Sequence, residues 1–318
     1  MDAPRVKVAF VGGASIPYDE AMSGFGGTQL CVLHIAGVLA KHHEVYVVHS
    51  KRREEFTGRS GIKYVKDIDC SSFGVIVDVR EVRHTFLKNV NYIHWIHDRH
   101  ATNPHKTNPD LGRYDSVIAL TRIQASMWGT TVPTHNFLVI NNPLIMEPVG
   151  RAAPQPGKIV ALSARANFGK CLAILKRLRR VDRRFVLHVC APSYDDISGR
   201  AGGDGSVINH GALSHLKTME LLSDAFVCLF PTESQENGPC ICYECMHYGV
   251  PMLTEYVAGS GANEILPKHL VLPRGSHADV YAKIILGWHK RGTRPAIRWN
   301  HRNHEIYQQW ENLVGSRR

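Results

Sequence analysis

The chain has 318 residues, of which 44% are hydrophobic, enough for two domains that each bury a core. Its formal net charge of +10 suits nucleic acid, an anionic membrane or a phosphate-bearing small ligand, so charge alone does not choose among them. The apolar runs are too short to span a bilayer, and Asp2 rather than a basic residue follows Met1. The cysteines are scattered rather than spaced as a disulfide framework, so we expect a soluble cytoplasmic protein.

The first half of the chain alternates short apolar runs with polar or helical stretches. VKVAFVGG predicts a buried parallel strand that ends in Gly12 and Gly13, and a glycine cluster with Gly26 and Gly27 precedes a helical pattern. Further strands are predicted at EVYVVHS, GVIVDV, NYIHWIH, SVIAL and FLVI. This order predicts a parallel sheet covered by helices, which is a Rossmann-like domain over residues 1–142.

A second series of the same kind follows a change in composition. The stretch 143–157 is rich in proline and reads as a linker, because it cannot continue a helix or a sheet. Strands are then predicted at KIVALSA, FVLHVCA, AFVCLF and VPMLTE, with helices between them. We expect a second Rossmann-like domain over 158–296 and a closing helix at about 297–318 that joins the first domain.

A basic cluster at 176–184 lies on an amphipathic helical pattern. The simplest interpretation is a helix whose basic face is exposed to solvent. The apolar side of this pattern consists of Leu172, Leu175, Leu178, Val181 and Phe185. Association with a membrane surface is the alternative that the charge leaves open. Nucleic acid is not expected as a partner, because no aromatic-interleaved basic motif, zinc-finger spacing or helix-turn-helix signature accompanies the charge.

The stretch PTESQENGPCICYECMHYGVPM carries the most informative pattern. Pro239 suits the first position of a helix and Gly249 the residue just past its end, so a helix is predicted over 239–248. Glu236 then lies in the loop before the helix and Glu244 lies on it. A helix carboxylate can accept hydrogen bonds from vicinal hydroxyls, and N–H groups at the amino end attract anions. Taken alone, two such glutamates are also ordinary surface residues.

The surrounding residues resemble glycosyltransferase family 4, whose members carry two glutamates separated by seven residues and then an Ala-Met-Ala-x-Gly-x-Pro pattern. This chain reads ENGPCICYECMHYGVP. In LSARANFGKC, Arg165 and Lys170 match the family's Arg and Lys, whereas Ala164 replaces its glycine. GFGGTQ, IHWIHD and AGSGANEIL resemble the family's other glycine-rich and histidine segments, in the right order along most of the chain.

The resemblance implies an α/β protein with the GT-B fold, in which two Rossmann-like domains place their parallel sheets across a central cleft. It implies that Glu244 holds the donor ribose, that Glu236 holds the donor sugar, and that Arg165 with Lys170 neutralises the diphosphate. The catalytic set implied in this way consists of Glu236, His97, Arg165 and Lys170, with His94 and His100 competing for the place of His97. The other donor-binding residues implied are Gly26, Gly27, Asn237, Gly238 and Pro239.

The implied activity is that of a retaining hexosyltransferase, with a sugar or glycan as acceptor. Cations and N–H donors can stabilise the charge that develops on the departing diphosphate, so no cofactor and no metal is expected. GDP-mannose is the expected donor, with UDP-glucose and UDP-N-acetylglucosamine as alternatives. Gly238 and Pro239 replace the family's Phe-Gly, which changes the loop that touches the sugar. A sugar-nucleotide 2-epimerase, a nucleotide-sugar binding module and a homodimeric state all stay open.

Two other groups of residues could indicate a zinc site or a dinucleotide-binding site. Cys240, Cys242, Cys245 and His247 are crowded into one short helix, whereas structural zinc sites use ligand pairs separated by a folding loop. Gly12 and Gly13 lack the spaced glycine fingerprint of a dinucleotide site, and no acidic residue ends the second predicted strand. The sequence therefore favours neither zinc nor a nicotinamide cofactor.

Overall fold

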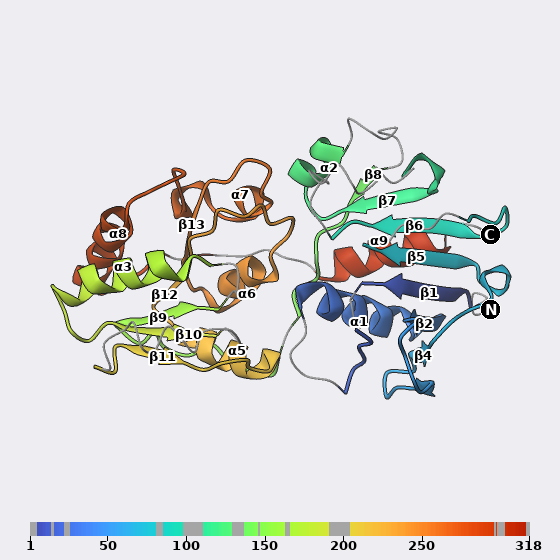
Figure 1. Ribbon diagram of the computed structural model, residues 1–318, viewed down its shortest axis with the longest axis horizontal. Coiled ribbons are helices and arrows are strands. Elements are labelled where there is room, and N and C mark those ends of the chain that lie inside the picture. Colours follow the sequence, from blue (N-terminus) through green and yellow to red (C-terminus); the bar gives the residue numbers. More distant parts are fainter. Residues whose placement is uncertain are drawn as a thin grey trace. The chain divides into compact units, whose positions relative to one another are not determined.

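The protein forms two compact units in its computed structural model, one of Met1–Ile145 with Arg302–Arg318 and the other of Met146–His301. Each unit is built on its own sheet, flanked by helices (Figure 1). The structure describes residues 5–13, 16–21, 26–80, 85–97, 111–128, 137–145, 147–162, 166–190, 204–295, 297 and 303–315. None of the helices in these ranges is both long and apolar enough to cross a membrane.

The sheet of the first unit has the strand order β3-β4-β2-β1-β5-β6-β7-β8 and is parallel except where β3 meets β4. Its strands are β1 (Lys7–Gly12), β2 (Glu44–Val48), β3 (Phe56–Thr57), β4 (Lys63–Val65), β5 (Val75–Val79), β6 (Asn91–Trp95), β7 (Ser116–Ala119) and β8 (Phe137–Val139). Every residue of β5 and β6 is buried, as expected for central parallel strands that are covered on both faces. Gly12 and Gly13 end β1 at φ values of 87° and 89°, which favour glycine.

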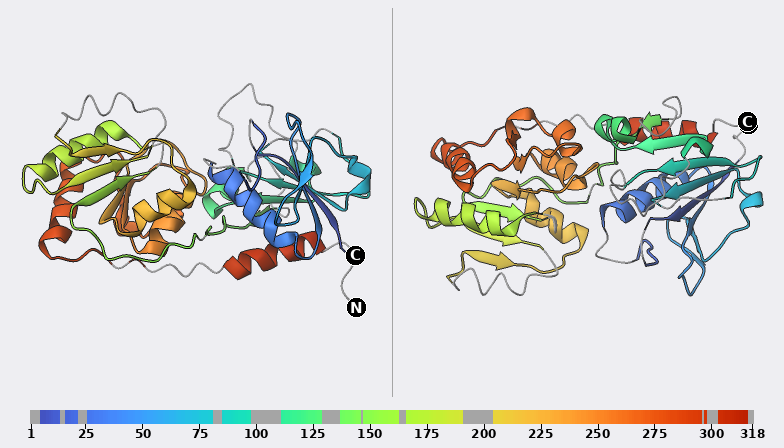
Figure 2. Two further views of the ribbon diagram at one scale, coloured as in Figure 1. Left: turned by 90° about the horizontal axis from the view of Figure 1, so that it is seen from below. Right: turned by 45° about the horizontal axis from the view of Figure 1, so that its top comes forward.

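Two helices far apart in sequence meet on this unit, α1 (Gly27–Leu39) and α9 (Asn303–Gly315) (Figure 2). The Trp310 ring of α9 packs against Phe10 and Trp95, with centroid distances of 5.9 and 4.7 Å. The Asn303 side chain accepts a hydrogen bond from the Leu144 N–H at 3.0 Å and donates one to the Leu144 carbonyl at 2.7 Å. These contacts attach the last helix to the first unit across 159 positions of sequence.

The sheet of the second unit is parallel throughout, with the order β11-β10-β9-β12-β13-β14. Its strands are β9 (Lys158–Ala161), β10 (Val186–Val189), β11 (Val207–Asn209), β12 (Val227–Phe230), β13 (Met252–Glu255) and β14 (Val271–Leu272). Right-handed crossovers place α3 (Phe168–Arg179) on one face and α5 (His215–Ser223) with α6 (Cys240–Tyr248) on the other. Helix α8 (Ala278–Lys290) packs beside α3, and α5 packs beside α6 (Figure 1).

The basic helix α3 corrects one prediction. Its buried face consists of Phe168, Cys171, Ile174, Leu175 and Leu178. Val181, assigned to that face from the sequence, is 60% exposed because the helix ends at Arg179, and Leu172 is only half-buried. On the basic side, Arg177 pairs with Asp279 and Arg179 with Asp204, so part of the positive charge is compensated within the unit.

Most of the predicted elements are confirmed within one to three residues, including the strands at the long apolar runs and the helix predicted at 239–248. The closing helix is described over Asn303–Gly315, and residues 298–302, with Trp299 among them, lie outside the described residues. Strands β3, β4, β11 and β14 were not predicted, because each has only two or three residues. The short helices α2 (Arg122–Trp128) and α7 (Ala262–Ile265) complete the two units.

Candidate functional site

The strand order of the second sheet defines where a ligand is expected. β9 and β12 are neighbours at its centre, and the chain continues from β9 to β10 on one side and from β12 to β13 on the other. Segments that leave a parallel sheet at such a topological switch point diverge, and open α/β sheets bind their ligands there, at the carboxyl ends of the strands. The two segments are 162–167, before α3, and 231–239, before α6.

The loop 231–239 is held through its backbone. The Gly261 N–H donates to the Glu236 carbonyl at 2.5 Å, and the Ser260 hydroxyl lies 3.3 Å from both the N and the O of Glu236. The Gln235 side chain donates to the Ala258 carbonyl at 2.8 Å. The glycine-rich stretch after β13 therefore fixes the position of Glu236 while leaving its carboxylate half-buried.

Helix α6 presents Glu244 as the sequence predicts. Pro239 caps its amino end, and Gly249 ends it with φ 66°, a left-handed conformation in which its N–H bonds back to Met246. Glu244 lies in the middle of this helix and is 6% exposed. A carboxylate this deeply buried requires a compensating partner. That partner is His215, whose Nε2 lies 2.9 Å from Glu244 Oε1.

His215 and Glu147 are residues of this site that the sequence did not reveal. His215 is the first residue of α5, and its Nδ1 lies 2.7 Å from Glu147 Oε1, so its ring bridges two carboxylates. Burial lowers the pKa of His215, but the hydrogen bonds and charges of Glu244 and then Glu147 outweigh it and raise the pKa to about 9. The histidine is therefore an imidazolium at neutral pH.

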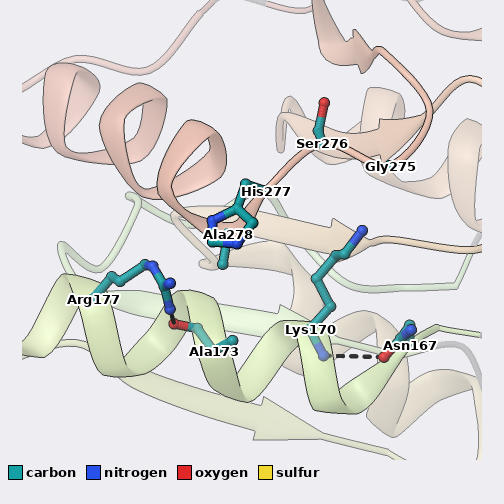
Figure 3. A pocket seen from close by; sticks show the side chains of 8 residues that line it. All are labelled: Asn167, Lys170, Ala173, Arg177, Gly275, Ser276, His277 and Ala278. Carbon is teal, nitrogen blue, oxygen red and sulfur yellow. Dashed lines mark hydrogen bonds between the residues drawn. The ribbon is translucent and has the colours of Figure 1, made fainter.

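Lys170 lies in the first turn of α3, where Asn167 caps the helix by accepting from the Lys170 N–H at 3.0 Å. Figure 3 shows the Lys170 side chain extending toward the segment of Gly275 and Ser276. Its ammonium pairs with the carboxylate of Glu255 at the end of β13, which is 3% exposed. Glu255 also accepts from the Gly275 N–H at 2.8 Å and the Tyr281 hydroxyl at 3.0 Å.

The ion pair of Lys170 with Glu255 was not predicted, since Lys170 was assigned to a ligand phosphate. A hollow of about 330 Å3 adjoins it between α3 and the amino end of α8 (Figure 3). Its lining consists of Asn167, Lys170, Ala173, Arg177, Gly275, Ser276, His277 and Ala278. Arg165, the other predicted phosphate ligand, lies outside the described residues.

The predicted residues of the first unit lie at the carboxyl edge of its sheet or at a helix start. Gly26 caps the amino end of α1 and Gly27 begins it, with no side-chain cap, so the first N–H groups of this helix face no capping side chain. His97 lies two residues beyond β6, where its ring packs on Trp95 at a centroid distance of 4.5 Å.

The competing histidines differ in their surroundings. His94 lies within β6, is 3% exposed and packs on the Tyr114 ring at 5.1 Å, while Tyr114 donates to Asp78 at 2.9 Å. This position suits a core histidine, whereas His97 follows the carboxyl end of its strand and is half-buried. His100 lies outside the described residues.

Two of the three crowded cysteines of α6 are core residues, whereas Cys240 is half-buried. Cys242 and Cys245 are fully buried, and burial raises the pKa of each thiol well above its usual range. Across the described ranges, no group of three histidine, cysteine, aspartate or glutamate side chains is arranged to hold a metal ion.

No protein-family model matches the sequence, and no curated protein matches it significantly. Solved structures do match. HepE of Anabaena in complex with UDP superimposes with a TM-score of 0.68 at 14% identity, over 98% of this chain and 100% of HepE. AviGT4, a glycosyltransferase of avilamycin A biosynthesis, gives 0.65 at 16% identity over 97% of both chains.

The match extends to further proteins. Sucrose-phosphate synthase of Thermosynechococcus elongatus gives a TM-score of 0.66 at 15% identity, over 98% of this chain and 96% of that one. TarM gives 0.59 at 15% identity over 76% of this chain, which spans only 54% of TarM. The fold implied by the resemblance to family 4 is thereby confirmed. This chain has the two-unit α/β architecture of the GT-B glycosyltransferases.

Proposed function

We propose that this protein is a retaining glycosyltransferase that moves a hexose from a nucleoside-diphosphate sugar to a sugar or glycan acceptor. The main support for this proposal is the position of three groups at the switch point of the second sheet. The buried Glu244, the loop of Glu236 and the first turn of α3 all come from segments that follow β9 and β12, the two strands at the switch point. That is where open parallel sheets bind nucleotides.

The proposed roles follow from the surroundings of each residue. Glu244 holds the ribose, because within the described part of the chain its Oε2 has no hydrogen-bond partner and can accept from ribose hydroxyls. Glu236 holds the donor sugar from a loop whose backbone is fixed. Lys170, the amino end of α3 and Arg165 offset the charge of the diphosphate.

The proposed reaction breaks the bond between the anomeric carbon and the diphosphate oxygen while the acceptor hydroxyl attacks the same face. The proton of that hydroxyl passes to the departing diphosphate. Arg165 and Lys170 stabilise the negative charge that develops there, so no divalent metal is needed. The proposed catalytic set also includes His97, and the proposed donor-binding set includes Gly26 and Gly27 at the amino end of α1. Asn237, Gly238 and Pro239 complete the donor-binding set.

The ligands bound in the similar structures support one choice of base and sugar for the donor. HepE was solved with UDP and with UDP-glucose, and GtfA with UDP and N-acetylglucosamine. Their folds match this one, which supports UDP-sugars as donors over GDP-mannose, the donor expected from the sequence. We therefore propose UDP-glucose or UDP-N-acetylglucosamine as the donor and keep GDP-mannose as the alternative to be tested.

The test is calorimetric binding of UDP, GDP and the three sugar nucleotides, followed by an assay of diphosphate release with and without sugar acceptors. We expect one diphosphate and its sugar to bind, and release to depend on an acceptor. Glu233→Gln is the matched control, since Glu233 is an exposed glutamate of the same loop, and this variant should behave as the parent protein.

Three results would contradict the proposal. Binding of none of the five ligands excludes a nucleotide site. Product formation from the donor alone, without a second sugar, identifies a 2-epimerase. Tight donor binding with neither transfer nor hydrolysis under any acceptor identifies a binding module.

A further inference from the structure

A buried histidine links the proposed ribose carboxylate to the segment that opens the second unit. Glu147, His215 and Glu244 come from three separate places: the stretch before β9, the start of α5 and the middle of α6. The side chains of His215 and Glu244 are 13% and 8% exposed, and that of Glu147 is 26% exposed. A bridge between three elements fixes the orientation of the His215 ring at its centre and of the Glu244 carboxylate, its most buried group.

The geometry itself requires a charged ring. Nε2 of His215 lies 2.9 Å from Glu244 and Nδ1 lies 2.7 Å from Glu147, and both partners are carboxylates. A neutral imidazole has one N–H and could donate to only one of them, whereas an imidazolium donates to both. The start of α5 is an unfavourable place for a cation, because the amino end of a helix carries positive partial charge, so only the paired carboxylates hold it there.

We propose that His215 is a positioning residue, which as an imidazolium holds the Glu244 carboxylate turned so that its second oxygen can receive the donor ribose, with Glu147 holding the histidine in place. This inference rests on the proposed function, since it assigns a task to the same site. His215 contacts Glu244 and not the ligand, so its effect on binding is indirect.

Among the described groups that interact with this cluster, His215 is the one whose pKa lies between neutral pH and pH 9. Tyr248, on α6, experiences the charges of both carboxylates, and burial raises its pKa further from neutrality. The Cys242 and Cys245 thiols of the same helix interact electrostatically with Glu244, and burial raises their pKa values well above the usual range. When His215 loses its proton above about pH 9, one of its two hydrogen bonds is lost.

The experiment measures the affinity for UDP, or for GDP if UDP does not bind, from pH 7 to pH 10 in the parent protein, His215→Gln and Glu147→Gln. Dividing the affinity of the parent by that of His215→Gln at each pH cancels the ionisation of the nucleotide. We expect His215→Gln to bind about tenfold more weakly near neutral pH, the lower end for one hydrogen bond to a charged group. The ratio should approach one as His215 deprotonates.

The Glu147→Gln variant distinguishes a role of His215 in orienting Glu244 from a general effect on the stability of the fold. It removes one of the two carboxylates that favour the imidazolium, so the midpoint of the pH dependence should fall by about one unit or more while affinity near pH 7 is kept. An NMR titration of the His215 ring protons, identified by their absence in His215→Gln, should show the same downward shift without any nucleotide.

His289→Gln is the matched control. His289 Nε2 lies 3.0 Å from Asp182 and its side chain is 15% exposed, so the variant removes a similar contact between a histidine and a carboxylate in the same unit. It should bind the nucleotide as the parent does. If His215→Gln fails to fold, comparing the pH dependence of nucleotide affinity in the parent with that in Glu147→Gln still tests the positioning role.

The outcomes distinguish this inference from the proposed function. Equal affinity of the parent and His215→Gln at every pH, an unshifted midpoint in Glu147→Gln, or an equal loss in His289→Gln would overturn the positioning role and leave the glycosyltransferase proposal intact. A parent protein that binds neither UDP nor GDP would overturn both.

Discussion

Replacing the loop glutamate and the helix glutamate by glutamine should weaken ligand binding in two different ways. Glu244 is 6% exposed, and a hydrogen bond from ribose to its charge is worth about 1.5–3 kcal/mol, which is about a 10- to 150-fold loss in affinity. Because the ribose is present in both ligands, Glu244→Gln should weaken the free diphosphate and the intact donor alike. Glutamine keeps the shape of the side chain, so the core around α6 is preserved.

Glu236→Gln should spare the free diphosphate. The Glu236 backbone is held by Ser260 and Gly261 and is unaffected by the substitution, whereas its half-buried carboxylate is expected to meet only the sugar. The cost should therefore appear as weaker donor binding or, if the contact tightens as the glycosidic bond breaks, as a lower kcat at unchanged affinity. Calorimetry of the free diphosphate and of the intact donor, with both variants, measures these affinities. Equal losses of diphosphate affinity in both variants would refute the assignment of ribose to Glu244 and sugar to Glu236.

Three further predictions concern charge and metal. Donor binding and transfer should persist in excess chelator, and a loss that magnesium or manganese restores would contradict the metal-free site. Glu255→Gln should lower the unfolding free energy by about 1–3 kcal/mol because it breaks a buried ion pair, yet tighten UDP binding because it releases Lys170; thermal unfolding and calorimetry test both effects. The pKa of His215 is raised from 6.5 to about 9, so its stabilising contribution is complete below about pH 6.5 and disappears by about pH 9. Urea unfolding should show that the free energy of unfolding falls by about 1–3 kcal/mol across this pH range in the parent protein. His215→Gln should not show this fall.

Local signals in the sequence were sufficient for the elements that carry the site. Pro239 and Gly249 mark the two ends of α6, because the constraint on φ in proline and the freedom of glycine act within a few residues of chain. The placement of Glu236 in a loop and of Glu244 on a helix followed directly from these two residues. Long apolar runs likewise predicted β1, β5, β9 and β12, since parallel strands covered on both faces need no alternation.

The same local reasoning failed where short segments or helix ends were concerned. Val181 was assigned to the buried face of α3 from its spacing, but the helix ends at Arg179, and a periodic pattern does not show where its helix stops. β11 and β14 have three and two residues, too few for any periodicity to be read.

Only the tertiary structure decided the partners of the buried charges. Lys170 meets Glu255 across 85 positions, and His215 meets Glu147 and Glu244 across 68 and 29 positions. These pairs depend on which strands are neighbours and on which face each helix packs, and the order β11-β10-β9-β12-β13-β14 is not encoded in any local pattern. The sequence alone determined that two carboxylates and a lysine follow parallel strands. Because a buried charge must find its counter-charge wherever the packed elements bring one, the fold determined which group neutralises each of them.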